Sequence, residues 1–301
     1  MFDVIVGANG QDGTLLSKIY ARHKKKVILI GRQPPPILLE NQHYITQDLR
    51  EYRKLDEKIS NFKIRTVIYL AATHSTRNKF EELDAQNVRL INFDAPKWLL
   101  QYLIRNRNIK SFVYTSSKLA FEGNGGSYSW QSKRKNDNEY SRSKNDFEQF
   151  AKTISDKLNW LLIIWMSNHE SKYRKEEFLI PRVVKKLSEC LIDEKNIFHE
   201  KYNVVNDWGD AEEFMEILYE FVQENKKKGI IKQFLSNNDL CSIDEIINEI
   251  LFYKSKYGDF LDNQRAADKN NIFISEREYL RKPIKSTRAT IWRLLNEYTE
   301  I

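Results

Sequence analysis

The chain has 301 residues, enough for one large α/β domain or two modest ones, and a formal net charge of +7. The basic residues are spread along the chain, without an arginine-rich arm or a zinc-ligand spacing, so they argue mildly for an anionic substrate and predict no nucleic-acid partner. Two distant cysteines, and no apolar run approaching ~18 residues, favour a cytoplasmic protein without a disulfide framework or a membrane partner.

A glycine-rich turn follows the first predicted strand, at residues 4–6. Its glycines, Gly7, Gly10 and Gly13, are spaced three apart, and a helical pattern follows at residues 15–23. Gly7 permits a tight turn, Gly10 lets the backbone approach a pyrophosphate, and Gly13 lets the helix pack close to the strand. Phosphates would bind the free amides at the start of that helix. The pattern predicts a dinucleotide-binding turn, and a purely structural βα turn is the alternative.

The second predicted strand, at residues 27–30, ends in Gly31-Arg32 without an acidic residue. Enzymes that prefer NAD usually place Asp or Glu there, to accept a hydrogen bond from the ribose 2′-hydroxyl. An arginine instead suits the 2′-phosphate of NADP, through its charge and its planar donors. We therefore predict NADP(H) as the cofactor, with NAD(H) as the alternative. The opposing interpretation of Arg32 is a surface arginine beside a proline-rich loop.

Strands and helices continue to alternate, which predicts βαβ units and an α/β fold with a doubly wound parallel sheet of the Rossmann type. Ala71 and Ala72, at the end of one strand, are small enough for a dinucleotide to lie across the strand ends. We expect a dinucleotide-binding core over residues 1–165 and a smaller α/β region over 166–301 that mainly binds substrate, with some segments returning to the core sheet. The strands are predicted near 44–45 and at 66–72, 111–117, 161–165 and 230–235, and the helices at 52–59, 87–104, 211–224, 242–253 and 290–298.

Tyr140 and Lys144 lie four residues apart, hence on one face of a predicted helix. An ammonium beside a phenol favours the phenolate, so we expect Lys144 to lower the pKa of Tyr140 toward the working range. Ser117, at the end of the preceding strand, can donate to the same substrate oxygen. Tyr-x-x-x-Lys alone is common on exposed helix faces, but after a glycine turn and a strand ending in hydroxyls it predicts a catalytic set.

Together these motifs resemble the extended short-chain dehydrogenase/reductases of the NAD-dependent epimerase/dehydratase family, which act on nucleotide sugars. Residues 10–13, 167–171 and 207–211 look like the corresponding stretches of GDP-mannose 4,6-dehydratases, and the resemblance covers most of residues 1–225. It implies a guanosine-linked nucleotide sugar as substrate, a homodimer and no metal. For the cofactor it implies contacts from Gly7, Asn9, Gly10, Gln11, Asp12, Gly13, Arg32, Asp48, Leu49, Leu70, Ala71, Ala72, Asn87, Lys144 and His169. For the substrate it implies contacts from His74, Asn168, Arg174, Arg182, Asn203 and Arg281.

Two departures from the family pattern concern the reaction. A dehydratase of this family carries an acid two residues after the catalytic hydroxyl, to help expel water from the sugar, and this chain has Leu119 there. Asn206 replaces the arginine that meets the substrate phosphates in the family. We therefore predict an NADP(H)-dependent oxidoreductase acting at C4, as a 4-keto-sugar reductase or C4 dehydrogenase. The alternatives are an epimerase, a 4,6-dehydratase that uses another acid such as Glu122, and a catalytically degenerate NADP(H)-binding protein.

Overall fold

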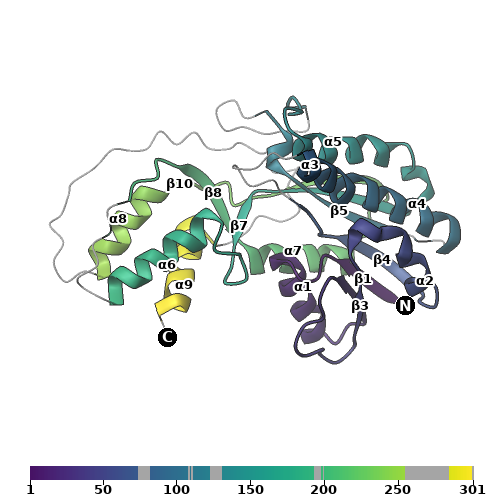
Figure 1. Cartoon of the computed structure of the whole chain (residues 1–301), viewed down its shortest axis with the longest axis horizontal. Helices are drawn as coiled ribbons and strands as arrows, with labels where there is room; N and C mark the ends of the chain where they lie inside the picture. The colour runs from purple at the N-terminus through teal and green to yellow at the C-terminus, as the bar shows by residue number, and fades with distance from the viewer. Residues whose placement is uncertain are drawn as a thin grey trace.

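The computed structural model describes residues 1–73, 82–107, 109, 111–122, 131–192, 198, 200–254 and 285–299. Within these residues the chain forms a large parallel sheet covered by helices and a smaller part built around a three-stranded sheet (Figure 1). Two predicted substrate contacts, His74 and Arg281, lie outside the described residues. No helix in the described ranges combines the length and the apolar character needed to cross a bilayer.

The large sheet has seven strands in the order β3-β2-β1-β4-β5-β6-β9, and every pairing in it is parallel. Its central strands read as continuous apolar runs because helices cover both faces; every residue of β6 is buried. This confirms the predicted α/β fold with a doubly wound sheet. The strands are β1 (Phe2–Val6), β2 (Val27–Gly31), β3 (Gln42–Thr46), β4 (Ile64–Tyr69), β5 (Ser111–Ser117), β6 (Trp160–Met166) and β9 (Gly229–Leu235).

Two helical layers bury the two faces of this sheet. Val4 and Val6 point into one apolar cluster and Ile5 into the other, as the period of two in a strand requires. α1 (Gln11–Arg22) and α7 (Ala211–Glu224) pack together on one face, whereas α2 (Leu55–Ile59), α4 (Ala95–Arg107) and α5 (Glu139–Lys152) cover the other (Figure 1). α1 begins four residues earlier than predicted because Gly10, with extended backbone, already serves as its N-cap.

The helix predicted over residues 87–104 is interrupted. α3 (Glu82–Arg89) is followed by a π-helical turn, Leu90–Asp94, and then by α4. Pro96 has no N–H for the Asn92 carbonyl, and the Ala95 N–H donates to Leu90 instead of Ile91. Two tyrosines of the sheet replace the missing donors: Tyr114 Oη lies 2.5 Å from the Asn92 oxygen, and Tyr69 Oη lies 2.6 Å from the Ile91 oxygen. Both carbonyls that the interruption frees are therefore hydrogen-bonded.

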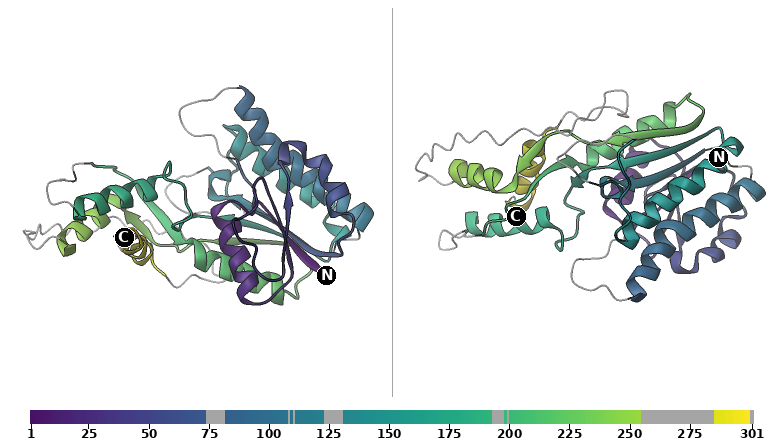
Figure 2. Two further views of the ribbon diagram at one scale, coloured as in Figure 1. Left: turned by 60° about the horizontal axis from the view of Figure 1, so that its bottom comes forward. Right: turned by 90° about the horizontal axis from the view of Figure 1, so that it is seen from above.

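The smaller part follows the carboxyl end of β6 and extends away from the large sheet (Figure 2). β8 (Val205–Asp210) is its central strand, parallel to β7 (Asn168–Glu170) and antiparallel to β10 (Leu240–Ser242). The sequence analysis predicted none of these three strands, nor helix α6. Its apolar cluster joins three helices, α6 (Leu179–Ile192), α8 (Ile243–Lys254) and α9 (Thr287–Thr299). Ser242 caps α8, because its Oγ accepts from the Glu245 amide at 3.4 Å.

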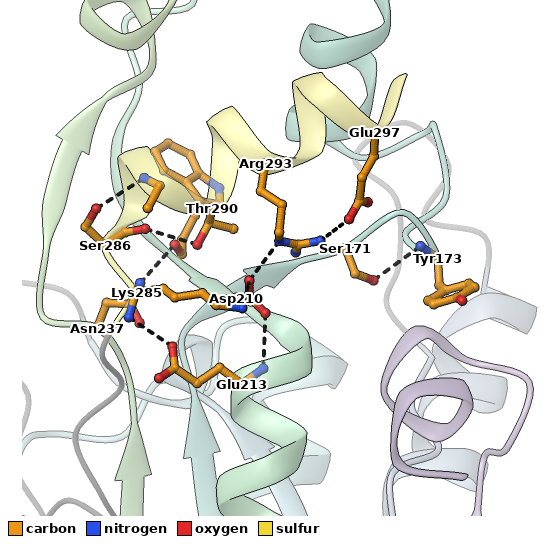
Figure 3. A network of polar contacts seen from close by, with 12 residues as sticks. Ser171, Tyr173, Asp210, Glu213, Asn237, Lys285, Ser286, Thr290, Arg293 and Glu297 are labelled. Carbon is orange, nitrogen blue, oxygen red and sulfur yellow. Dashed lines mark hydrogen bonds and ion pairs between the residues drawn. The ribbon is translucent and has the colours of Figure 1, made fainter. Parts of the chain in front are cut away.

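A buried carboxylate fixes α9 to this sheet. Asp210 caps α7 through the Glu213 amide at 3.1 Å, and its other oxygen accepts from Lys285 Nζ at 2.9 Å and Arg293 Nε at 3.0 Å (Figure 3). Asp210 is fully buried, so two cations and a backbone donor are what make its charge tolerable there. Since Asp210 stands opposite Glu170 in the β7–β8 ladder, this network also fixes β7, which carries Asn168 and His169.

Candidate active site

The turn between β1 and α1 leaves no room for side chains at two of its glycines. Gly7 has φ +98°, and a Cβ on it would lie 2.6 Å from the Ala71 nitrogen. A Cβ on Gly13 would lie 2.3 Å from the Gly7 oxygen, so helix and strand approach too closely for any other residue. Gly10 differs, because its Cβ would meet only the Gly7 oxygen, at 3.4 Å. The N-cap of α1 is Gly10, which has no side chain to bond the first-turn amides, so these amides suit an anionic ligand.

A cleft of about 480 Å³ opens at this turn and runs past the ends of β2, β3 and β4. Its volume is in the range of small-molecule and cofactor sites. Most of the predicted cofactor residues line it: Gly7, Asn9, Gly10, Gln11, Asp12, Gly13, Arg32, Asp48, Leu49, Leu70, Ala71, Ala72 and Asn87. The sequence analysis missed several lining residues: Ile30, Gly31, Gln47, Arg50, Thr73, Ile91 and Lys175. Arg50 and Gln47 flank the predicted Asp48, so their position directly after a strand was the available signal.

Two arginines at one end of this cleft differ in their partners. Arg50 binds Asp48 with Nη2 at 2.6 Å from Oδ2, and this hydrogen bond, more than the charge itself, holds the pKa of Asp48 below its usual range. Arg32 is exposed and forms no hydrogen bond or ion pair with the residues that the structure describes. The chain leading away from it is fixed by Asn9, whose Nδ2 donates to the Gln33 oxygen at 2.5 Å. Arg32 therefore offers a free guanidinium to a ligand in the cleft.

Ser117, Tyr140 and Lys144 come together beside the carboxyl end of β5. Asn138 caps α5 through the Ser141 amide at 2.9 Å, which places Tyr140 in the first turn of that helix. The Ser117 hydroxyl lies close enough to Tyr140 to interact with its phenol. Lys144 Nζ is buried, donates to the Thr115 oxygen at 2.8 Å, and lies 5.8 Å from the centre of the Tyr140 ring. The three side chains form the hydroxyl, phenol and ammonium set that the sequence predicted.

The predicted lowering of the Tyr140 pKa is wrong for the free protein. Burial raises the pKa of Tyr140, and the interaction with the Ser117 hydroxyl opposes this only in part. Burial also lowers the pKa of Lys144 to about 7, so this lysine carries only part of its charge at neutral pH. The sequence argument assumed a full ammonium in solvent, whereas both groups are desolvated. Tyr140 is thus a neutral phenol, ready to donate a proton.

His169, on β7, does not line the cleft itself but binds Asp12, which does. Its Nε2 lies 2.9 Å from Asp12 Oδ1 and its Nδ1 lies 2.7 Å from the Ser167 oxygen. Burial alone would lower the pKa of His169, but Asp12 outweighs it and the pKa is raised. Both ring nitrogens face acceptors, which favours the imidazolium. Gln11 adds a second link, because its Nε2 donates to the His169 oxygen at 3.0 Å. The Gln-Asp pair of the glycine turn therefore holds β7 against α1.

The remaining predicted substrate residues divide into two groups. Asn168 begins β7, next to His169, and Arg174 lines the cleft itself, with its guanidinium 3.7 Å from the centre of the Phe178 ring. Arg182, on α6, and Asn203, before β8, are both exposed in the smaller part and do not line the cleft. Asn203 donates its amide to Asp244 at 2.7 Å. Substrate contacts by these residues stay predictions.

The model of a family described as "NAD dependent epimerase/dehydratase family" matches residues 4–233. The chain belongs to this family. Among curated proteins no significant match is found. The match supports the family as a whole and does not single out the GDP-mannose 4,6-dehydratases.

Solved structures of similar fold cover nearly the whole chain of this family member. The Bordetella bronchiseptica enzyme WbmG, in complex with NAD and UDP, is 18% identical with a TM-score of 0.75, over 99% of this chain and 94% of its own. MoeE5, in complex with UDP-glucuronic acid and NAD, is 15% identical with a TM-score of 0.79, over 100% of this chain and 99% of its own. The dTDP-glucose 4,6-dehydratase of Bacillus anthracis, in complex with NAD, is 16% identical with a TM-score of 0.73, over 100% of this chain and 97% of its own. At these sequence identities, the structural similarity supports the fold alone.

Proposed function

We propose that this chain is a nucleotide-sugar epimerase that oxidises and re-reduces C4 of the sugar with a bound nicotinamide dinucleotide. The observation that carries the proposal is the joining of Ser117, Tyr140 and Lys144 at the strand ends beside a cleft built on the glycine turn. The glycines fit a pyrophosphate, because Gly10 leaves open the space that a Cβ would fill. When bound, the dinucleotide would accept a hydride from C4 and return it.

The side chains divide the remaining work. Tyr140 Oη exchanges the proton of the C4 hydroxyl, and Ser117 hydrogen-bonds the same oxygen. Lys144, fixed by the Thr115 carbonyl, is a donor for the ribose and, when protonated, supplies positive charge next to Tyr140. The imidazolium of His169 is held by Asp12 at the edge of the cleft. None of these roles requires a further acid, so hydride exchange at C4 is complete with the groups present.

The elimination of water is not supported by the residues after Ser117. Leu119 is 42% exposed and has no proton to donate or accept. Lys118, the other neighbour, points to Asn206. We therefore favour the epimerase activity over the 4,6-dehydratase activity. The Tyr-Lys pair also argues against a catalytically degenerate protein, because a protein that only binds the dinucleotide would not need both members.

A second candidate, the 4-keto-sugar reductase, is favoured by one specific observation. Tyr140 has a raised pKa and is a proton donor at neutral pH, as reduction of a ketone requires. The free guanidinium of Arg32 supports NADP(H) in either case, although the structures of WbmG and MoeE5 hold NAD. The guanosine-linked substrate and the homodimer stay predictions from the family resemblance. UDP-linked sugars are tested beside GDP-linked ones because the structures of WbmG and MoeE5 hold UDP and UDP-glucuronic acid.

The experiment is to incubate the purified chain, with NADP or NAD, with UDP-linked and GDP-linked hexoses and to follow the C4 configuration by NMR. The proposal predicts epimerisation without net consumption of dinucleotide. Net oxidation of NADPH with a 4-keto nucleotide sugar, and no epimerisation, supports the reductase instead. No change at C4 with either set of sugars, in a chain that binds them, contradicts both.

A further inference from the structure

Lys118 is a charged group that hydride exchange at C4 does not use. It follows Ser117 directly, in the short 3₁₀ turn Lys118–Ala120, and its side chain crosses from the end of β5 to β8. Its Nζ donates to Asn206 Oδ1 in a short hydrogen bond. No carboxylate of the described ranges lies within ion-pair distance of this ammonium. Lys118 is therefore a half-buried cation whose one direct partner is a neutral amide.

The surroundings of Lys118 keep its ammonium protonated and leave it able to bind a further anion. Burial lowers its pKa to about 8, and the nearby charge of Asp207 opposes this shift. Asp207 is itself fully buried and accepts from Ser236 Oγ and from the Asn238 amide, the latter at 3.3 Å. These bonds hold Asp207 in the smaller sheet. An ammonium in such a position is stabilised by any further anion that reaches it.

The chemistry of the site limits which part of a sugar can reach Lys118. With the C4 oxygen between Tyr140 and Ser117, Lys118 follows Ser117 with its Cα ~3.8 Å away, so its backbone lies close to the substituents on either side of C4. These are the C3 hydroxyl and the C6 group on C5. Of the two, only C6 becomes an anion in an ordinary hexose derivative, when it is oxidised to a carboxylate. Leu119, the following residue, offers nothing polar.

We propose, resting on the function proposed above, that Lys118 binds the C6 carboxylate of the sugar and that the preferred substrates are nucleotide-linked hexuronates. Lys118 acts as a specificity residue, and Asn206 holds its ammonium in place when the carboxylate is absent. The ion pair between the Lys118 ammonium and the C6 carboxylate is charge-assisted and shielded from solvent. It therefore discriminates between hexuronates and hexoses more strongly than an exposed contact would. The competing role for Lys118 is a contact with the diphosphate of the substrate. Such a contact would strengthen the binding of nucleotide-linked hexoses and hexuronates equally.

The test is calorimetry on the dinucleotide-loaded protein with two matched pairs, UDP-glucuronate against UDP-glucose and GDP-mannuronate against GDP-mannose. In the pair whose nucleotide base the protein recognises, the hexuronate should bind at least tenfold more tightly than the hexose, a difference of about 1.4 kcal/mol. Lys118→Met should bring the ratio to within about twofold, whereas Lys118→Arg should keep most of it. Lys133→Met is the matched control, because Lys133 is exposed and paired with Glu122. Thermal unfolding checks each variant, and Lys118→Gln replaces the Met variant if that one does not fold.

The outcomes separate this inference from the proposed function. An unchanged ratio in Lys118→Met, or an equal loss for both sugars of a pair, overturns the role of Lys118 whatever the turnover. Discrimination that depends on Lys118, with no exchange at C4, supports the inference and contradicts the function. Turnover of hexoses with no preference for hexuronates contradicts the inference alone. Failure of every nucleotide sugar to bind contradicts both.

Discussion

Gly10→Ala tests whether the glycine turn binds a dinucleotide or only shapes the fold. The backbone at Gly10, with φ −75° and ψ 169°, suits alanine, and the new Cβ would meet only the Gly7 oxygen, at 3.4 Å. Alanine is a poorer N-cap than glycine, so we expect a loss of less than about 1 kcal/mol in the free energy of unfolding. The methyl group would instead occupy the space where the pyrophosphate approaches the backbone. Dinucleotide affinity should therefore fall at least tenfold, about 1.4 kcal/mol.

Gly13→Ala is the matched control, because it should damage the fold instead. Its Cβ would lie 2.3 Å from the Gly7 oxygen and 2.6 Å from the Ala8 Cα, so the backbone of α1 has to move. We expect a loss of about 1–3 kcal/mol or more in stability. Denaturant unfolding and calorimetry with NADP and NAD measure both effects. A Gly10→Ala protein that is stable and binds both dinucleotides with unchanged affinity would refute the role of the turn.

Three further predictions concern the cofactor, the buried lysine and the reaction. The wild-type chain should prefer NADP(H) over NAD(H) by at least about tenfold, and Arg32→Asp should reduce or reverse this in calorimetry; equal wild-type affinities would contradict it. Lys144 has a pKa of about 7 in the fold against 10.5 in the unfolded chain, so the unfolded state binds more protons between these values and stability should rise with pH there. In denaturant unfolding Lys144→Met should lack this rise, and a parallel pH dependence of both proteins would argue against the buried lysine. With GDP-mannose and NADP, mass spectrometry should detect no 6-deoxy-4-keto product, whereas Leu119→Glu should restore some elimination if the rest of the site is dehydratase-like. Such a product from the wild type would overturn the assignment and point to Glu122.

The large sheet was predictable because its determinants are local. Buried parallel strands are short apolar runs, and the glycine turn specifies its own backbone, so strands such as β5 were predicted with the observed bounds. The interruption between α3 and α4 was less accessible. Pro96 signalled a break, but the tyrosines that satisfy the freed carbonyls come from β4 and β5, more than 20 positions away from those carbonyls. Contacts of this kind depend on the assembled fold.

The site shows the same division between residue identity and residue environment. Spacing alone placed Tyr140 and Lys144 on one face of a helix, and the structure brings Ser117 to them. The direction of the Tyr140 pKa was wrong because desolvation is a property of the packed site and not of the motif. The link between Asp12 and His169 spans 157 positions, so each motif was visible in the sequence but their contact was not. The strands of the smaller sheet are short, with only three residues in β7, which leaves little periodicity to detect.

The most direct test of the account follows the hydrogen at C4. The nucleotide sugar that binds is prepared with deuterium at C4 and incubated with the dinucleotide-loaded chain, and both molecules are analysed by mass spectrometry. Transient reduction of the nicotinamide with transfer of the deuterium to it, slowed by about 10² or more in Tyr140→Phe without loss of dinucleotide binding, is the predicted result. A nicotinamide that never carries the deuterium while the sugar is bound, or transfer at the normal rate in Tyr140→Phe, would contradict the proposed chemistry.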